Sequence, residues 1–322
     1  MNNVNNVPVD VEEMRLWMQG YSNSFKPALT GAELAKQSGI PNGTLGPFLA
    51  GKYPGRNDNI ARKILAFKQK VEASKKVNDA LPADPGYFET DTSVKFERLL
   101  TLAHTGRITA IGTGPGTGKT ITINEYREAR SEVFVATMSP STRSLVQMII
   151  EVQLALGMIP KRMRAADASR TVVDRLTGRK ALLVIDEANH LNYESIDELR
   201  SWHDRTGVGL CLAGNEELIR EIQQGKNKDA FARLNSRIAR VYVQQTPEAD
   251  DVIAFCNGWG ISDPAIREYL ITIGTHRDAG GLRECKQLVE MASYIADEDG
   301  RGLALFDLQA VQRTRGSKWI KA

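Results

Sequence analysis

A glycine-rich stretch, "IGTGPGTGKT" at residues 111–120, follows a short apolar run and constrains this chain more than any other feature. Glycines let successive backbone N–H groups turn toward one anion, and a helix that starts there adds the positive end of its dipole. A flexible linker is the alternative explanation for so many glycines. In the phosphate-binding pattern G-x-x-x-x-G-K-[ST], the first glycine position is occupied by Thr113, between Gly112 and Gly114, so the match is loose.

The sequence around this stretch alternates between apolar β-type runs and helical segments, from about residue 95 to residue 246. Several runs are continuously apolar, which is typical of strands buried on both faces. The expected strands are 107–112, 132–138, 181–186, 208–214 and 239–244. We therefore predict an α/β domain with a mostly parallel five-stranded sheet over 95–246, in which a helix begins near Thr117. Consecutive helical segments over 247–322 predict a C-terminal helical lid that ends in a basic tail.

A second motif supports nucleotide binding. The run "ALLVIDEANHL" is an apolar strand that ends in Asp186 and Glu187, as expected for the acidic partner of a P-loop. In this interpretation Lys119 contacts the β- and γ-phosphates, Thr120 and Asp186 hold Mg²⁺, and Glu187 polarises the attacking water. The predicted cofactors are ATP and Mg²⁺. The remaining predicted contacts of the loop with the phosphates are Gly114, Pro115, Gly116, Thr117 and Gly118.

Four further polar residues are candidates, each with a structural alternative. Asn215 follows the strand "GLCLAGN" and either contacts the water and γ-phosphate or caps the next helix. Arg233 and Arg237 in "FARLNSRIARV" either stabilise a neighbouring subunit's transition state or form a surface pair. Arg283 in "GGLRECKQL" opens a lid helix and either touches the nucleotide or remains exposed.

The N-terminal residues 1–77 predict a separate small all-α domain, joined by a Pro-, Asp- and Gly-rich linker at 78–94. Residues 30–50 have the pattern of a short helix, a glycine turn and a second short helix, which is the helix-turn-helix of DNA-binding proteins. Gly46 and Pro47 lie inside the second helix, which favours contacts to the DNA backbone over base reading. The residues predicted to contact double-stranded DNA are Asn42, Thr44, Lys52, Arg56, Arg62 and Lys63.

Composition excludes several classes. The net charge is only +3, but residues 51–76 and the last fourteen residues, which carry Lys318 and Lys321, are strongly basic, as expected for a polyanionic partner. Three well-separated cysteines suggest neither a disulfide framework nor a zinc site. We find no secretory signal and no apolar run long enough to span a bilayer, so we expect a cytoplasmic protein without a membrane partner.

These blocks resemble the AAA+ ATPases and, more narrowly, the Mu B type of phage transposition proteins. The resemblance covers most of the chain. It rests on "GPGTGKT" as Walker A, "LLVIDEANHLNYESIDELR" as Walker B, "GLCLAGNEELI" as sensor 1, "FARLNSRIAR" as the arginine-finger region and "GGLREC" as sensor 2. It implies an ATP-dependent, largely sequence-tolerant DNA-binding ATPase that forms helical filaments on target DNA. It also implies delivery of that DNA to a transposase, and disassembly driven by hydrolysis (target immunity), with Arg237 as the finger.

Two other functions remain open at this stage. One is a helicase-loader or initiator-type AAA+ ATPase, which would copurify with a replicative helicase rather than a transposase. The other is a DNA-binding regulator that senses nucleotide without turnover, which the presence of Glu187 disfavours.

Overall fold

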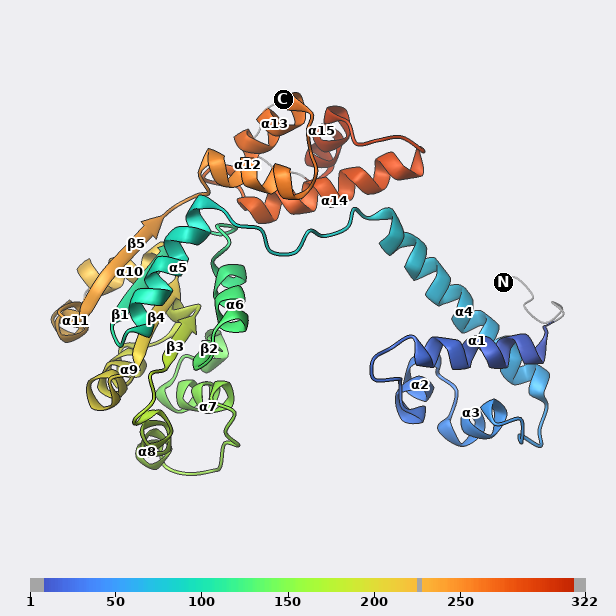
Figure 1. Ribbon diagram of the computed structural model, residues 1–322, viewed down its shortest axis with the longest axis horizontal. Helices are drawn as coiled ribbons and strands as arrows, with labels where there is room; N and C mark the ends of the chain where they lie inside the picture. The colour runs from blue at the N-terminus through green and yellow to red at the C-terminus, as the bar shows by residue number, and fades with distance from the viewer. Residues whose placement is uncertain (1–8, 225–227, 316–322) are drawn as a thin grey trace. The chain divides into compact units, whose positions relative to one another are not determined.

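The computed structural model describes residues 9–224 and 228–315 (Figure 1). The chain divides into two compact units, with the boundary between Pro82 and Ala83. The boundary therefore falls inside the segment that the sequence predicts as a linker.

The first unit is entirely helical in its described part. Its second helix begins with a capping box in which Thr30 and Glu33 bond to each other's backbone N–H, and it ends at Gly39, whose φ of 69° is left-handed. The third helix follows after three residues and continues through Pro47. Apolar side chains from all four helices share one core that includes Leu45 and Phe48. The helices are α1 (Val11–Asn23), α2 (Gly31–Ser38), α3 (Asn42–Leu49) and α4 (Asn57–Ala80).

A five-stranded parallel sheet forms the centre of the second unit, in the order β2-β3-β4-β1-β5. Every residue of β1, β3 and β4 is buried, which agrees with the continuous apolar runs in the sequence. The predicted parallel α/β architecture is confirmed, and the strand ends differ from prediction by at most one residue. The strands are β1 (Ile108–Thr113), β2 (Val133–Thr137), β3 (Leu182–Asp186), β4 (Gly209–Gly214) and β5 (Ile238–Gln244).

Helices cover both faces of this sheet. Alternate strand residues face opposite ways, so that Leu182 and Val184 pack with α5 and α6, whereas Leu183 and Ile185 pack with α7 to α11. Helix α6 begins at Lys119 rather than near Thr117 because the loop before it remains non-helical as far as Gly118. The helices are α5 (Asp91–His104), α6 (Lys119–Ala129), α7 (Leu145–Ala155), α8 (Ala165–Leu176), α9 (Tyr193–Thr206), α10 (Glu216–Gln224) and α11 (Lys228–Asn235), with short 3₁₀ turns η2 (Pro140–Thr142) and η3 (Ala188–His190).

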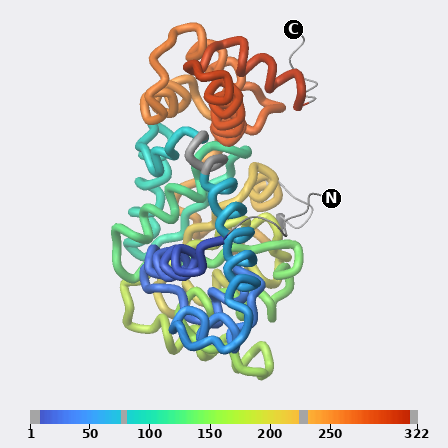
Figure 2. The backbone as a smooth tube through the Cα atoms, turned by 90° about the vertical axis from the view of Figure 1, so that its right-hand side faces the viewer, coloured from blue at the N-terminus to red at the C-terminus, as the bar shows by residue number. Residues whose placement is uncertain are grey.

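A group of four helices follows β5 and has its own apolar core, which contains Cys256 and Cys285. Figures 1 and 2 show these helices, in orange to red, gathered beyond the carboxyl ends of the strands. The helices are α12 (Ala249–Gly258), α13 (Pro264–Gly274), α14 (Leu282–Glu298) and α15 (Leu305–Thr314). None of the helices in the described part of the chain combines the length and apolar character that a membrane crossing requires.

Candidate functional site

The glycine-rich loop leaves β1 at the carboxyl edge of the sheet, where ligands of parallel α/β folds bind. Thr113, at the position where the pattern has its first glycine, is the last residue of β1 and pairs with Gln244 of β5. It is buried, and its hydroxyl lies 2.9 Å from that of Thr117. The left-handed conformations fall later, on Gly116 (φ 68°) and Gly118 (φ 85°), so threonine is acceptable at position 113.

The lysine of the loop and the acids that follow β3 meet at this edge. Lys119 Nζ donates to the carbonyl oxygen of Gly214 at 2.9 Å, and it lies 3.9 Å from Asp186 Oδ1 and 3.8 Å from Glu187 Oε1. The Thr120 hydroxyl donates to Asp186 Oδ2 at 2.8 Å. The two motifs identified in the sequence, 66 residues apart at Thr120 and Asp186, are therefore in direct contact.

The two acids have different environments. Asp186 is 1% exposed, and its Oδ1 also accepts the backbone N–H of Glu187 at 2.9 Å. Glu187 is 41% exposed and has a φ of 53°, a conformation that costs a non-glycine residue roughly 1–3 kcal/mol. A buried carboxylate fixed by two hydrogen bonds suits an ion-holding role, whereas an open carboxylate on a strained turn suits contact with a substrate or water.

A cavity of about 860 Å³ opens beside these residues. Its wall includes the whole loop from Thr113 to Thr120 together with Glu187, Asn215 and Arg283. Helix α14 closes this part of the wall, because the Leu282 N–H donates to the Gly116 carbonyl at 3.0 Å. The predicted residues that the structure brings together here are Gly114, Pro115, Gly116, Thr117, Gly118, Lys119, Thr120, Glu187, Asn215 and Arg283, with Asp186 buried behind them.

Part of the cavity wall was not predicted from the sequence. Tyr87 and Phe88, from the segment predicted as linker, line the cavity together with Trp259 of the lid. Phe88 packs edge-on against Phe255 at 6.0 Å between ring centroids, and Asp84 accepts a hydrogen bond from Lys286. The only sequence signal was the aromatic pair in "GYFETDT", which is unusual in a linker. These side chains add an aromatic part to the cavity wall.

Asn215 caps the next helix, as one of its two sequence-based alternatives predicts. Its Oδ1 accepts the Leu218 N–H at 3.2 Å, so it caps α10, and it also lines the cavity. Its own backbone N–H donates to Asn189 Oδ1 at 3.2 Å. Asn189, which was not a sequence candidate, thus ties the turn after β3 to the end of β4.

The two candidate finger arginines lie outside the described wall of the cavity in their own chain. Arg237 Nε donates to Asp204 Oδ1 at 2.6 Å, and its Nη1 donates to the carbonyl of Arg233 at 2.8 Å. Burial raises the pKa of Asp204, but the hydrogen bond and charge of Arg237 together with the charge of Arg200 outweigh this and lower it overall. Arg233 is exposed on α11. Within a single chain, neither arginine reaches the P-loop.

The residues predicted to contact DNA all belong to the first unit. Asn42 and Thr44 lie on α3, and Arg62 and Lys63 lie on α4. The basic loop between these helices carries the last two, Lys52 and Arg56. Of the C-terminal basic tail, Lys318 and Lys321 lie outside the described residues.

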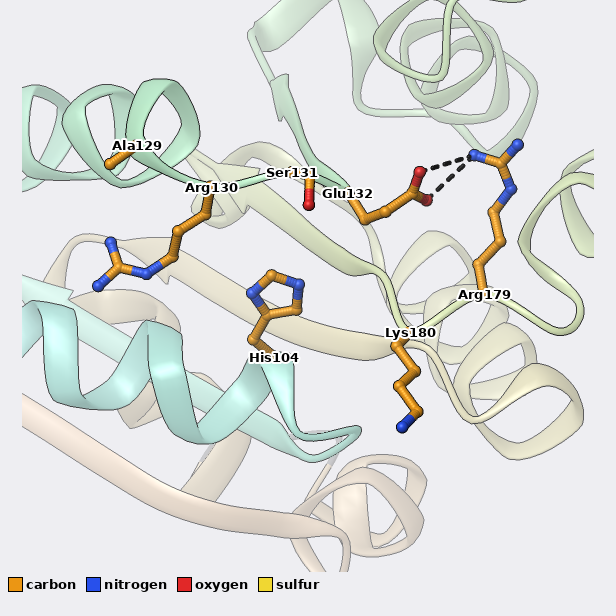
Figure 3. Close-up of a pocket in the computed structure, with 7 residues that line it drawn as sticks. All are labelled: His104, Ala129, Arg130, Ser131, Glu132, Arg179 and Lys180. Atoms are coloured by element: carbon orange, nitrogen blue, oxygen red, sulfur yellow. Dashed lines mark hydrogen bonds and ion pairs between the residues drawn. The ribbon is translucent and has the colours of Figure 1, made fainter.

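A second hollow lies at the opposite edge of the sheet, where β2 and β3 begin (Figure 3). His104, Arg130 and Lys180 line it, and Arg179 donates to both carboxylate oxygens of Glu132, at 3.0 and 3.4 Å. Arg130 stacks on Tyr126 and lies 4.0 Å from a carboxylate oxygen of Glu97. Two of its three permanent cations are thus compensated by carboxylates, and the P-loop elements lie at the other end of the strands.

Comparison with known proteins matches two parts of the second unit to protein families. Residues 103–222 match the AAA domain family, and residues 236–314 match the family described as Mu B transposition protein, C terminal. The fold is similar to a chain in a structure of Drosophila ORC bound to DNA (TM-score 0.52, 15% identity), with 72% of this chain and 62% of that chain covered.

Full-length relatives are more similar in sequence. The ATP-dependent target DNA activator B of Escherichia phage Mu is 32% identical over 294 residues, covering 89% of this chain and 88% of the relative. The Mu-like prophage FluMu DNA transposition protein B of Haemophilus influenzae is 33% identical over 238 residues, covering 72% of this chain and 81% of the relative. On this similarity, and with the AAA domain ahead of the Mu B C-terminal domain, the chain belongs to the Mu B family of transposition proteins.

Proposed function

We propose that this protein is an ATP-dependent, largely non-sequence-specific DNA-binding ATPase that captures target DNA for a transposase. The observation that carries the proposal is the contact of Thr120 with Asp186 beside Lys119, in a chain that belongs to the Mu B family. The relative from phage Mu is named an ATP-dependent target DNA activator, which supports the assignment of both ligands. A helicase-loader role is disfavoured by the match of residues 236–314 to the Mu B C-terminal family.

The donor set fits a Mg²⁺–ATP complex. Mg²⁺ prefers hard oxygen ligands, and the Thr120 hydroxyl and the Asp186 carboxylate provide adjacent ones at the mouth of the P-loop. A bound Mg²⁺ would supply charge neutralisation of the β- and γ-phosphates. Lys119 stands next to this pair, where its ammonium group can bind the same phosphates. The aromatic part of the cavity wall, at Tyr87, is suited to the nucleoside.

Glu187 is the proposed general base. Its carboxylate opens toward the cavity and lies 3.8 Å from Lys119 Nζ, so it stands near the position that a γ-phosphate bound by Lys119 would take. Asn215, at the end of the adjacent strand, is placed to hydrogen-bond the attacking water or the γ-phosphate. Arg283 lines the same cavity from the lid, where it would contact a bound nucleotide.

Arg237 completes the site of a neighbouring copy in this proposal. Arg237 lies outside the described cavity wall of its own chain, where Asp204 binds its guanidinium. It would therefore act on a nucleotide bound by a neighbouring copy. Arg233 is the second candidate for this role. Filament stability then depends on the γ-phosphate, so hydrolysis loosens the assembly and releases DNA.

Electron microscopy of the purified protein with duplex DNA tests the proposal. We expect helical filaments with a non-hydrolysable ATP analogue, and isolated particles with ADP or without nucleotide. A strand-transfer assay with the cognate transposase should show target capture only under the filament-forming condition. A protein that stays monomeric and free of DNA in the presence of the analogue would contradict the proposal.

A further inference from the structure

The first unit contains a cavity of about 820 Å³ between the end of α2 and one face of α4. Four of the residues that line it are lysines: Lys36 from α2, and Lys63, Lys70 and Lys75 from α4. The remaining lining residues are neutral. We call this hollow the lysine cavity.

Nothing in the described part of the chain compensates these four ammonium groups. No carboxylate lines the cavity, and none of the four lysines forms an ion pair there. Two acids of this unit have other partners, because Glu33 caps α2 through Thr30 and Glu13 pairs with Lys68. Glu72 of α4 is three residues from Lys75 but does not line the cavity. Like charges that share a cavity repel one another, so this arrangement is stabilised when an anion enters.

The hollow of Figure 3 provides a contrast within the same chain. There Arg179 is bound by Glu132 and Arg130 lies near Glu97, so part of the positive charge is already neutralised. The lysine cavity has no such internal partner among its described lining residues. Of the two basic hollows, it is the one suited to an external polyanion.

The spacing of the lysines fits an extended anion rather than a single one. Lys63, Lys70 and Lys75 all line the cavity from α4 and are seven and five residues apart, which places the first and last roughly 18 Å apart along the helix. That length corresponds to about five base pairs of duplex, at roughly 3.4 Å per phosphate on each strand. All four lysines are exposed, so their ammonium groups can adjust to a backbone.

Part of the cavity wall is aromatic. Tyr21 and Phe67 line it, and their rings meet edge-on at 5.3 Å between centroids. Tyr21 also stacks on Trp17 at 5.4 Å, and its hydroxyl donates to Gln37 at 2.9 Å. Because the ring faces are already occupied within the protein, they serve as a fixed base for the lysines rather than as a platform for stacking unpaired bases.

We propose that the lysine cavity is the site where the N-terminal unit binds the phosphate backbone of duplex DNA. This inference rests on the proposed DNA-binding function and locates part of it on α2 and α4 rather than on the α3 side at Asn42, Lys52 and Arg56. Lysines act as point charges and do not read base edges with paired hydrogen bonds, so the contact is independent of sequence.

The test compares two double substitutions in the full-length protein. One is Lys36→Gln with Lys70→Gln in the cavity, and the matched control is Lys26→Gln with Lys68→Gln, two lysines of the same unit that do not line the cavity. Binding of a fluorescent duplex is measured by anisotropy at 50 to 200 mM salt with a non-hydrolysable ATP analogue. Two unrelated DNA sequences are used, and circular dichroism and analogue affinity check folding.

We expect the slope of log K against log salt to be less negative in the cavity variant by about 1.8, since each phosphate contact contributes about −0.9. When salt rises from 50 to 200 mM, the fold-loss of DNA affinity should therefore be about ten times smaller in the cavity variant than in the parent. This difference should be the same for both DNA sequences. The control variant should keep the slope of the parent.

Three outcomes would overturn the inference: an unchanged slope in the cavity variant, a larger loss in the control variant, or normal DNA binding with loss of transposase activation only. The last of these would indicate an acidic protein as the ligand. If the parent itself binds no DNA with the analogue, the proposed function fails. If the parent binds and the cavity variant binds equally well, only this inference fails.

Discussion

The cavity at the glycine-rich loop, which we call the nucleotide cavity, and the lysine cavity have similar volumes, about 860 and 820 Å³. They differ in how exposed their lysines are and in whether carboxylates lie beside them. In the nucleotide cavity, Lys119 is only 11% exposed and lies among the Gly214 carbonyl, Asp186 and Glu187. In the lysine cavity, all four lysines are exposed, and no carboxylate lines the described wall.

This difference indicates two kinds of recognition. A site for one triphosphate needs few charges in a fixed geometry, because each of them acts on a particular oxygen of the ligand. A site for a polyanion needs charge density, and its individual lysines are nearly interchangeable. Substitutions in the first site should therefore have large effects that salt changes little, whereas those in the second should have moderate effects that follow salt concentration.

The largest expected effect comes from Arg237→Ala. If this residue completes the site of a neighbouring copy, DNA-stimulated ATP hydrolysis should fall about 10³-fold, because an arginine supplied in trans stabilises the charge of the transition state. Single-chain nucleotide affinity should stay near that of the parent, since Arg237 lies outside the described wall of its own cavity. A steady-state phosphate-release assay and equilibrium binding of a fluorescent ATP analogue measure the two quantities.

Two control variants show whether a loss of hydrolysis in Arg237→Ala is specific to its guanidinium. Arg240→Ala removes an exposed arginine three residues away, on β5, and should leave hydrolysis unchanged. Asp204→Asn keeps Arg237 but removes the carboxylate that binds it, and should preserve most of the activity. Equal loss in Asp204→Asn and Arg237→Ala would mean that their contact supports the fold and that no finger acts in trans.

Glu187→Gln should have the next largest effect. Removing the proposed general base should lower the hydrolysis rate by about 10²- to 10³-fold while ATP still binds. Filaments on DNA should then persist in ATP instead of disassembling, which electron microscopy over time can follow. The control is Glu128→Gln, a carboxylate from α6 that lines the same cavity away from Lys119. If the Glu187→Gln protein hydrolysed ATP at the rate of the parent, Glu187 would not be the general base.

Gly116→Ala tests how strictly the geometry of the nucleotide cavity is fixed. A Cβ on Gly116 would lie 1.9 Å from the carbonyl oxygen of Gly280, so the lid would have to move away from the loop. Gly118→Ala has the same left-handed strain, about 1–2 kcal/mol, but meets nothing within 4 Å. Thermal unfolding without nucleotide should show Gly116→Ala less stable than Gly118→Ala by about 1–3 kcal/mol. Equal midpoints would mean that the lid does not press on the loop.

The sequence predicted the centre of the nucleotide site because its residues are adjacent in short motifs. The loop at 113–120 and the acids at 186–187 each follow a buried strand, and parallel strands bring their carboxyl ends to one edge. The five strands were also predictable from local sequence, because short continuous apolar runs between helical segments are typical of buried parallel strands.

The periphery of both cavities could not be predicted in this way. Tyr87 and Phe88 lie in a segment whose Pro and Gly content predicts a linker, and only tertiary packing shows that they line the cavity. Lys36 and Lys70 are 34 residues apart and share no motif, so their meeting depends on how α2 packs against α4. Arg237 was recognisable as a candidate, but its bond to Asp204 depends on how the segment after α11 packs against α9, which no local pattern encodes.

The smallest expected effect, from Asp84→Asn, tests an exposed part of the nucleotide cavity, where salt should screen the charges as it does in the lysine cavity. Asp84 and Lys286 form an ion pair at the rim, and both side chains are substantially exposed, at 52% and 41%. The pair holds the segment with Tyr87 and Phe88 near α14, so its loss should weaken nucleotide binding two- to fivefold, within the roughly 0–1 kcal/mol range of exposed pairs. High salt should abolish most of this difference.

The pH dependence of the same pair has a defined sign. The hydrogen bond from Lys286, followed by that from the Gly86 backbone N–H, lowers the pKa of Asp84 in the folded protein. A carboxyl with a lowered folded pKa contributes stability above its ordinary pKa of about 3.9, and this contribution is lost as pH falls through the folded value. The stability gap between parent and Asp84→Asn should therefore be constant from pH 7 to 5 and close only below about pH 4.

The control for nucleotide binding is Asp299→Asn, which removes the carboxylate of another exposed ion pair, with Arg301, and should leave nucleotide affinity unchanged. If both variants weakened nucleotide binding equally, the rim pair would have no special part in closing the cavity, and its wall would depend on aromatic packing alone.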